Sequence, residues 1–189
     1  MSAFFSAPIA SVLLAIELLL FELRGRSLVP VALAVAAATG LRQVLIGQGP
    51  VFPMPGVDAP GTGALLFYAA LAVVVAVFSV IVTRFFYFLE DSFEKIPVHW
   101  MWYPAIGGLI VGIIGYFQPQ TMAMGYNLID DIVNAKLALT VLASIGALKL
   151  LSWSIALASG TSGGTLAPLF IIGGSLGGCL GLIFAHLFP

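Results

Sequence analysis

Long apolar runs, separated by short polar stretches, dominate the sequence. Each run is close to the length of roughly 20 residues that a helix needs to cross a bilayer. The six runs cover residues 4–23, 28–46, 64–89, 100–117, 137–158 and 166–188. This pattern predicts an all-α, polytopic membrane protein, a bundle of tilted and partly broken helices, formed by one domain over residues 1–189.

Polar stretches mark where the chain leaves the apolar layer. Two of them, near 47–63 and 118–136, are expected to be polar loops, and the first is rich in glycine and proline and has no periodicity. The third run ends in charged residues, among them Glu90 and Asp91, which we expect to lie in water. Trp100, Trp102 and Tyr103 open the fourth run and are typical of an aromatic belt at the membrane interface.

The composition supports the prediction of a membrane protein, and the net charge argues against a nucleic-acid partner. The chain is 61% hydrophobic and only 8% charged, whereas a soluble domain carries about 25% charged residues. The net charge of −1 gives no sign of a nucleic-acid partner. We expect a multi-pass protein of the plasma membrane, with the lipid bilayer as its solvent, and no metal, nucleotide or organic cofactor is implied.

Glycines recur on one face of two of the predicted helices. Gly107, Gly108, Gly112 and Gly115 lie in the fourth run, and Gly173, Gly174, Gly177, Gly178 and Gly181 lie in the sixth. Spacings of three and four residues place such glycines on a common stripe, where small residues allow helix backbones to approach closely. We expect tight helix packing along these stripes.

The segment ASGTSGGTLAP, residues 158–168, stands apart from the apolar runs on either side. Non-helical backbone at membrane depth persists only where it is buried in protein or lines a wet cavity. A helix beginning near Thr165 would direct unpaired N–H groups of Thr165 and Leu166 toward the space cleared by Gly163 and Gly164. Such a helix start holds an anion without a fixed positive charge. A tight turn in a helical hairpin explains the same residues equally well.

The run SGTSGGTLAPLFIIGGSLGG resembles the signature GSG-x-x-GG-x-x-x-P of the ClC family of chloride channels and chloride/proton antiporters. FFSAPIASVLLAIELLL and PVHWMWYPAIGGLIVGIIGYFQPQTMAMGYNLID resemble family segments that precede that signature. The resemblance implies chloride transport and a homodimer that associates through the first two helical segments. It places the amides of Thr165 and Leu166 at the central anion site, although the family often has an aromatic residue where Leu166 stands.

Other segments of the family pattern do not occur in this sequence. No G-x-E-G-P run, which carries the gating glutamate of the family, is found, and no G-S-G-I-P segment. We therefore expect a central piece of a ClC-type membrane domain that is incomplete at both ends.

Glu17 is a carboxylate within an apolar run, which makes it a candidate for the ion or proton pathway. By resemblance it falls where the family has a glutamate near the cytoplasmic end of the pathway. Antiporters carry a second glutamate directly after it, and here that position is Leu18. The alternative is structural, with Glu17 pairing with Arg24 or Arg26.

Two further sets of charged residues have a structural interpretation. Lys149 lies inside the fifth run and is expected to find a buried structural partner rather than an anion. Asp130 and Asp131 are expected to be solvated loop acids.

Two functions other than anion transport are compatible with parts of the sequence. Gly160-Thr161-Ser162-Gly163 fits the serine motif of intramembrane proteases, but neither His99 nor His186 is placed to act as its base. A non-conducting structural membrane subunit is the other alternative. The favoured function is anion transport, which is not an enzymatic activity.

Overall fold

The computed structural model describes residues 2–20, 24–47, 49, 51–53, 61–122 and 125–187. The chain divides into two units, Met1–Pro53 and Met54–Pro189, and each is described by itself. The described residues form helices and no strands. Within these described ranges, five helices are long and apolar enough to cross a membrane: Gly25–Leu45, Leu65–Glu94, Trp100–Phe117, Leu139–Ala158 and Leu166–His186. The predicted all-α membrane fold is confirmed.

The first unit contains the two predicted segments nearest the N-terminus. The first segment is broken into α1 (Ser2–Phe5), α2 (Pro8–Ala15) and a π-helical stretch, Ile16–Leu20, and α3 (Gly25–Leu45) follows. The break falls at Ser6, whose φ is 52°, directly before Pro8 opens α2. The Ser2 hydroxyl reaches α3, where it contacts the Thr39 hydroxyl and lies 3.3 Å from the Val35 carbonyl oxygen.

Large apolar side chains remain exposed on the first unit. Ile9, Leu13, Val29, Leu33 and Leu41 are among them. The first two segments, through which the resemblance implies dimer formation, thus have exposed apolar side chains on both α2 and α3, while residues 21–23 lie outside the described part of the chain. The dimer interface itself stays a prediction.

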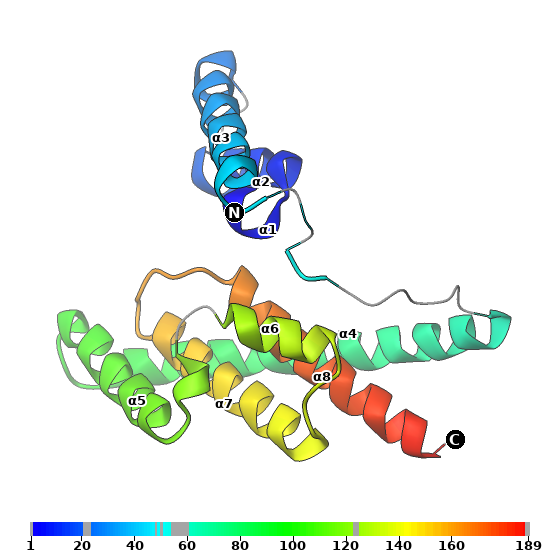
Figure 1. Cartoon of the computed structure of the whole chain (residues 1–189). Helices are drawn as coiled ribbons and strands as arrows, with labels where there is room; N and C mark the ends of the chain where they lie inside the picture. The colour runs from blue at the N-terminus through cyan, green and yellow to red at the C-terminus, as the bar shows by residue number, and fades with distance from the viewer. Residues whose placement is uncertain are drawn as a thin grey trace. The chain divides into compact units, whose positions relative to one another are not determined.

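The second unit is organised around α7 (Leu139–Ala158), which packs against α8 (Leu166–Leu187), α5 (Tyr103–Phe117) and α4 (Thr62–Glu94). Figure 1 shows these four helices, with the short α6 (Tyr126–Val133) packed against α8. A single turn, Trp100–Trp102, precedes α5, and another, Pro119–Thr121, follows it.

Helix α4 extends further than predicted. It reaches Glu94, so Glu90 and Asp91 lie within the helix and not in the connection after it. At 1.5 Å per residue its 33 residues span about 50 Å. No glycine or proline interrupts residues 90–94, and the first helix breaker is Pro97, which explains the additional turn.

The polar stretch 118–136 is not a simple loop. It contains α6 (Tyr126–Val133), whose apolar side chains Leu128, Ile129 and Ile132 are buried. The spacing of these residues is helical, and a stripe this short is hard to separate from a loop when the neighbouring residues are polar. The other predicted loop, 47–63, has residues 48, 50 and 54–60 outside the described part of the chain.

The glycine stripes pack at some positions and not at others. A Cβ added at Gly107 would lie 2.5 Å from Ser159, and one added at Gly178 would lie 2.5 Å from Leu142. A Cβ added at Gly115 would lie 2.4 Å from Met122, and one added at Gly174 would make a looser but still tight contact of 3.0 Å with Ile132. The other glycines of the two stripes, Gly108, Gly112, Gly173, Gly177 and Gly181, face open space. The predicted close packing is therefore confirmed for one edge of each stripe.

Candidate functional site

The segment 159–165 begins by closing the C-terminal end of α7. The Ser159 N–H donates to the Ile155 carbonyl over 3.0 Å, and the Gly160 N–H donates to the Leu157 carbonyl over 2.9 Å. Gly160 has a φ of +81°, the left-handed conformation that glycine adopts readily after a helix end. The chain therefore turns away from the α7 axis at this point.

Two hydroxyl groups stabilise the same turn. The Ser159 hydroxyl donates to the Ala156 carbonyl oxygen over 2.7 Å, and the Thr161 hydroxyl donates to that oxygen as well. Carbonyl groups in the last turn of a helix lack intrahelical donors, so these bonds satisfy one of them. Sequence reasoning treated both residues only as polar loop residues; a serine or threonine directly after a helix is the signal for such a role.

Ser159 also fixes the position of the segment against α5. Its side chain is 1% exposed and packs against Gly107. No larger residue fits at position 107 without moving Ser159, because a Cβ there would come within 2.5 Å of both side-chain atoms of the serine. The start of the segment is thus held between α5 and α7.

The end of the segment forms the start of α8. The Thr165 carbonyl accepts from the Leu169 N–H over 3.1 Å, which makes Thr165 the N-cap. Pro168 has no N–H to satisfy. Among the described residues, no acceptor is found for the N–H groups of Thr165, Leu166 and Ala167. The sequence predicts this for Thr165 and Leu166, and the structure adds Ala167. A Cβ at Gly163 or Gly164 would meet no atom within 4 Å.

Non-helical backbone between two spanning helices is expected to be buried in protein or to line a cavity, and residues 159–164 are buried only in part. Ser159 is buried, but Ser162, Gly163, Gly164 and Thr165 are exposed. The buried end contacts α5, whereas no described side chain of the second unit covers the glycines. The anion site at Gly163–Leu166 stays a prediction.

Glu17 lies in the first unit, on the π-helical stretch Ile16–Leu20, and is exposed. Within the described residues its carboxylate makes no ion pair with Arg24 or Arg26, so the structural alternative receives no support. The side chain of Leu18 lies outside the described part of the chain.

Lys149 has the buried structural partner that the sequence predicts. Its side chain is 5% exposed, and its ammonium donates to the Thr121 carbonyl oxygen over 2.7 Å. This contact joins α7 to the turn that follows α5. A charge that is buried within a membrane-spanning helix requires such a partner.

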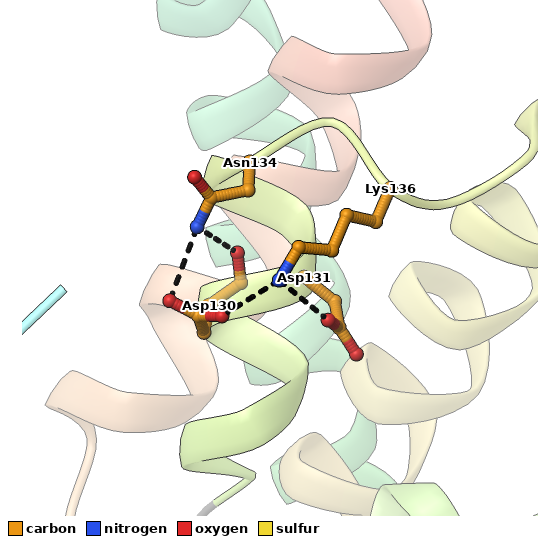
Figure 2. A network of polar contacts seen from close by, with 4 residues as sticks. All are labelled: Asp130, Asp131, Asn134 and Lys136. Carbon is orange, nitrogen blue, oxygen red and sulfur yellow. Dashed lines mark hydrogen bonds and ion pairs between the residues drawn. The ribbon is translucent and has the colours of Figure 1, made fainter. Parts of the chain in front are cut away.

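Asp130 and Asp131 form a polar network at the end of α6, shown in Figure 2. The Lys136 ammonium lies 3.1 Å from Asp130 and 3.5 Å from Asp131, and the Asn134 amide donates to Asp130 over 3.1 Å. The hydrogen bond and the charge of Asp130 raise the pKa of Lys136. The residues thus connect α6 to the segment before α7, and no group of three metal-ligating side chains occurs in the described ranges.

The protease alternative requires a histidine near Ser162. The His99 ring lies beside that of Trp100, with centroids 5.5 Å apart and planes tilted by 34°, and its Nδ1 accepts from the Met101 N–H. His186 lies in the last turn of α8, about 30 Å from the start of that helix. In the part of the chain that the structure describes, Ser162 has no hydrogen bond to either histidine, so these two residues do not serve it as a general base.

The chain is similar in sequence to known chloride channels and transporters. Residues 1–189 match the family model described as voltage gated chloride channel. The chain is 27% identical over 191 residues to chloride channel protein CLC-f of Arabidopsis thaliana, covering 94% of this chain and 24% of that protein. It is also 27% identical over 200 residues to the H(+)/Cl(-) exchange transporter ClcA of Salmonella arizonae, covering 100% of this chain and 41% of that one. The chain thus spans less than half the length of these relatives, and it belongs to the voltage-gated chloride channel family.

Proposed function

We propose that this chain is part of a protein that moves chloride or a similar inorganic anion across the plasma membrane. The observation that carries the proposal is the start of α8. Three consecutive backbone N–H groups, at Thr165, Leu166 and Ala167, have no acceptor among the described residues, and two glycines leave the approach to them open.

The chemistry of this helix start suits a transported anion. The orphaned N–H groups and the helix dipole supply partial positive charge. Partial charges allow both binding and release, whereas conduction fails when an ion is bound too tightly. The nearest fixed cation on α7, Lys149, is already hydrogen-bonded to a carbonyl oxygen, and its charge is not required for the site.

The experiment is Gly164→Val, measured as chloride flux into vesicles that contain the protein. A valine would fit sterically, because nothing lies within 4 Å of a Cβ at this position, but its side chain would occupy the approach to the donors. We expect normal expression and a large loss of flux. Gly160 is unsuitable as a control because of its positive φ, so Gly177→Val, which also faces open space on α8, serves instead.

The two variants separate the anion site from a mere turn. Unchanged flux and selectivity in Gly164→Val, with normal expression, would show that the segment only connects α7 to α8. Loss of flux in both variants would show that α8 does not tolerate valine, and would remove the support that this experiment gives.

We further propose that transport is not strictly coupled to protons. Glu17 is exposed on the first unit, and the position after it is Leu18, which has no carboxylate to continue a proton route. A chloride gradient across vesicles should therefore drive little uphill proton movement. Robust proton pumping at a fixed ratio to chloride would contradict this part of the proposal.

A homodimer is the assembly that we propose, associated through the exposed apolar side chains of α2 and α3. Two copies that bury these side chains against each other would remove apolar surface from lipid and gain the close packing that drives helix association in membranes.

A further inference from the structure

Helices α5 and α7 are joined at two points in the second unit. At the first, Gly107 of α5 packs against Ser159, where the segment that leads to α8 begins. At the second, the Lys149 ammonium on α7 donates over 2.7 Å to the carbonyl oxygen of Thr121, in the turn after α5. Lys149 lies about 15 Å from Ser159 along α7, and Gly107 lies about as far from the end of α5. The two contacts thus hold α5 against α7 at separate points along both helices.

The turn that accepts the Lys149 hydrogen bond is itself bonded to α5. The Thr121 N–H and hydroxyl both donate to the Gln118 carbonyl oxygen, over 3.0 and 2.8 Å. The Gln118 N–H donates to the Ile114 carbonyl over 2.9 Å, at the last turn of α5. Because these bonds connect Thr121 directly to the helix, the carbonyl that Lys149 holds moves together with the end of α5.

Both contacts favour a single register of α5 against α7. A buried ammonium is costly unless it donates hydrogen bonds, and lipid offers Lys149 no other acceptor. Ile110 and Val111 follow Gly107 on the same face of α5, three and four residues further on. Their side chains would exclude Ser159 from the space that the glycine leaves, so a helix that slides along α7 loses this contact.

The segment before α8 is held at its ends, so it takes up any change in this register. Cβ atoms added at Gly160, Gly163 and Gly164 would meet no atom within 4 Å. Ser159 is buried at one end of the segment, and the packing of α8 on α7 and α6 fixes the other end. A displacement of Ser159 is therefore absorbed between residues 160 and 165, next to the N–H groups that open α8.

We propose that Lys149 is a positioning residue for the anion site. Its hydrogen bond sets the register of α5, which places Ser159 and, through the segment, the N–H groups that open α8. Lys149 does not touch the anion, and its charge is not required there. The inference rests on the proposed function, because it assigns a further residue to that same site.

The first test is Lys149→Met, which keeps the stem of the side chain and removes the donor. Chloride flux into vesicles that contain the whole protein is measured against chloride concentration and normalised to folded protein. We expect the half-saturating chloride concentration to rise about fivefold, the effect of losing one net hydrogen bond at the site. A purely structural role would reduce the amount of folded protein and leave that concentration unchanged, and this result would overturn the proposal.

Ser154→Ala is the matched control on α7. Ser154 is buried, its hydroxyl has no partner among the described residues, and it lies about 140° around the helix from Lys149. The half-saturating chloride concentration should stay at the value of the unaltered protein. A rise equal to that of Lys149→Met would show that the site responds to any loss of a buried polar group on α7, and would also overturn the proposal.

Lys149→Gln keeps the proposal testable if the methionine variant does not fold. Its amide is a neutral donor on a shorter stem, so the bond re-forms only if the Thr121 carbonyl moves toward α7. The half-saturating chloride concentration should again rise, and an unchanged value would count against the proposal.

A double-mutant cycle tests the route through the register. Lys149→Met and Gly107→Ala displace the same contact, so together they should raise the half-saturating concentration by much less than the product of their single effects. Gly178→Ala supplies the control cycle, because the contact of 2.5 Å that it creates is with Leu142, between α8 and α7. There the effects should multiply, and multiplied effects in the Gly107 cycle would overturn the proposal.

Gly164→Val separates this inference from the proposed function. Unchanged flux in that variant would remove the anion site itself. Loss of flux there, with an unchanged half-saturating concentration in Lys149→Met, would overturn only the role of Lys149.

Discussion

The contact between Gly107 and Ser159 leads to the most direct prediction, through the substitution Gly107→Ala. The added Cβ would lie 2.5 Å from both the Cβ and the Oγ of Ser159, against 3.4–4 Å for an ordinary contact. The hydroxyl can rotate away, but the Cβ cannot, because it is fixed to a backbone that is hydrogen-bonded to Ile155. The backbone of the segment before α8 must therefore move.

The size of the effect follows from two opposing terms. Overpacking a close contact costs about 1–3 kcal/mol, and glycine to alanine within a helix gains about 1 kcal/mol. With a contact this short we expect a net loss of about 2 kcal/mol, or about 4–8 °C in the midpoint of thermal unfolding for a chain of this size. Gly108→Ala meets no atom within 4 Å and should instead raise the midpoint by about 2–4 °C.

The assay is thermal unfolding of the purified protein, in which the fraction of protein that stays monodisperse is measured at each temperature. Chloride flux into vesicles is measured in parallel. Gly107→Ala should lower both the unfolding midpoint and the chloride flux. Ser159→Gly should restore stability in the Gly107→Ala background, and Ser159→Ala should not, because it retains the Cβ that clashes. The reasoning is refuted if Gly107→Ala and Gly108→Ala unfold at the same temperature.

Three further predictions concern charge and assembly. Lys149→Met keeps the side-chain stem but removes the donor to a buried carbonyl, and should lower the free energy of unfolding by about 1–3 kcal/mol; an unchanged unfolding midpoint would contradict it. Because Asp130 raises the pKa of Lys136 above its ordinary value of 10.5, the stability that their ion pair contributes is fully present below pH 10.5 and is lost as pH rises through the raised value. Asp130→Asn should lower the pKa of Lys136 in an NMR titration, and no change would show that the pair does not persist in solution. A single cysteine at Leu33 should cross-link the protein into dimers, whereas one at Leu66 on α4 should not, and monomers alone at Leu33 would count against the proposed interface.

The helices were predictable because their signal is local. A run of about 20 apolar residues has few alternatives to a spanning helix, since backbone groups in lipid must be satisfied within the segment. Helix ends were less predictable. Glu90 and Asp91 are hydrophilic and so suggest a boundary, yet helix propensity continues α4 to Glu94.

The candidate site was predictable in part for the same reason. Pro168 three residues after Thr165 marks a helix start, and the start itself orphans the N–H groups. The partners that hold the segment lie far away in the sequence. Nothing near Ser159 indicates that it packs against Gly107, and nothing near Lys149 indicates the carbonyl of Thr121.

The sequence by itself determined that this is an all-α membrane protein of the voltage-gated chloride channel family, because apolar run length and motif order are properties of the linear chain. Only the tertiary structure decided which glycines are contact points. Gly107 and Gly108 are neighbours with the same chemistry, and one faces Ser159 while the other faces open space. That difference depends on how α5 is rotated against α7, which is set by the packing of side chains from both helices together and not by either segment alone.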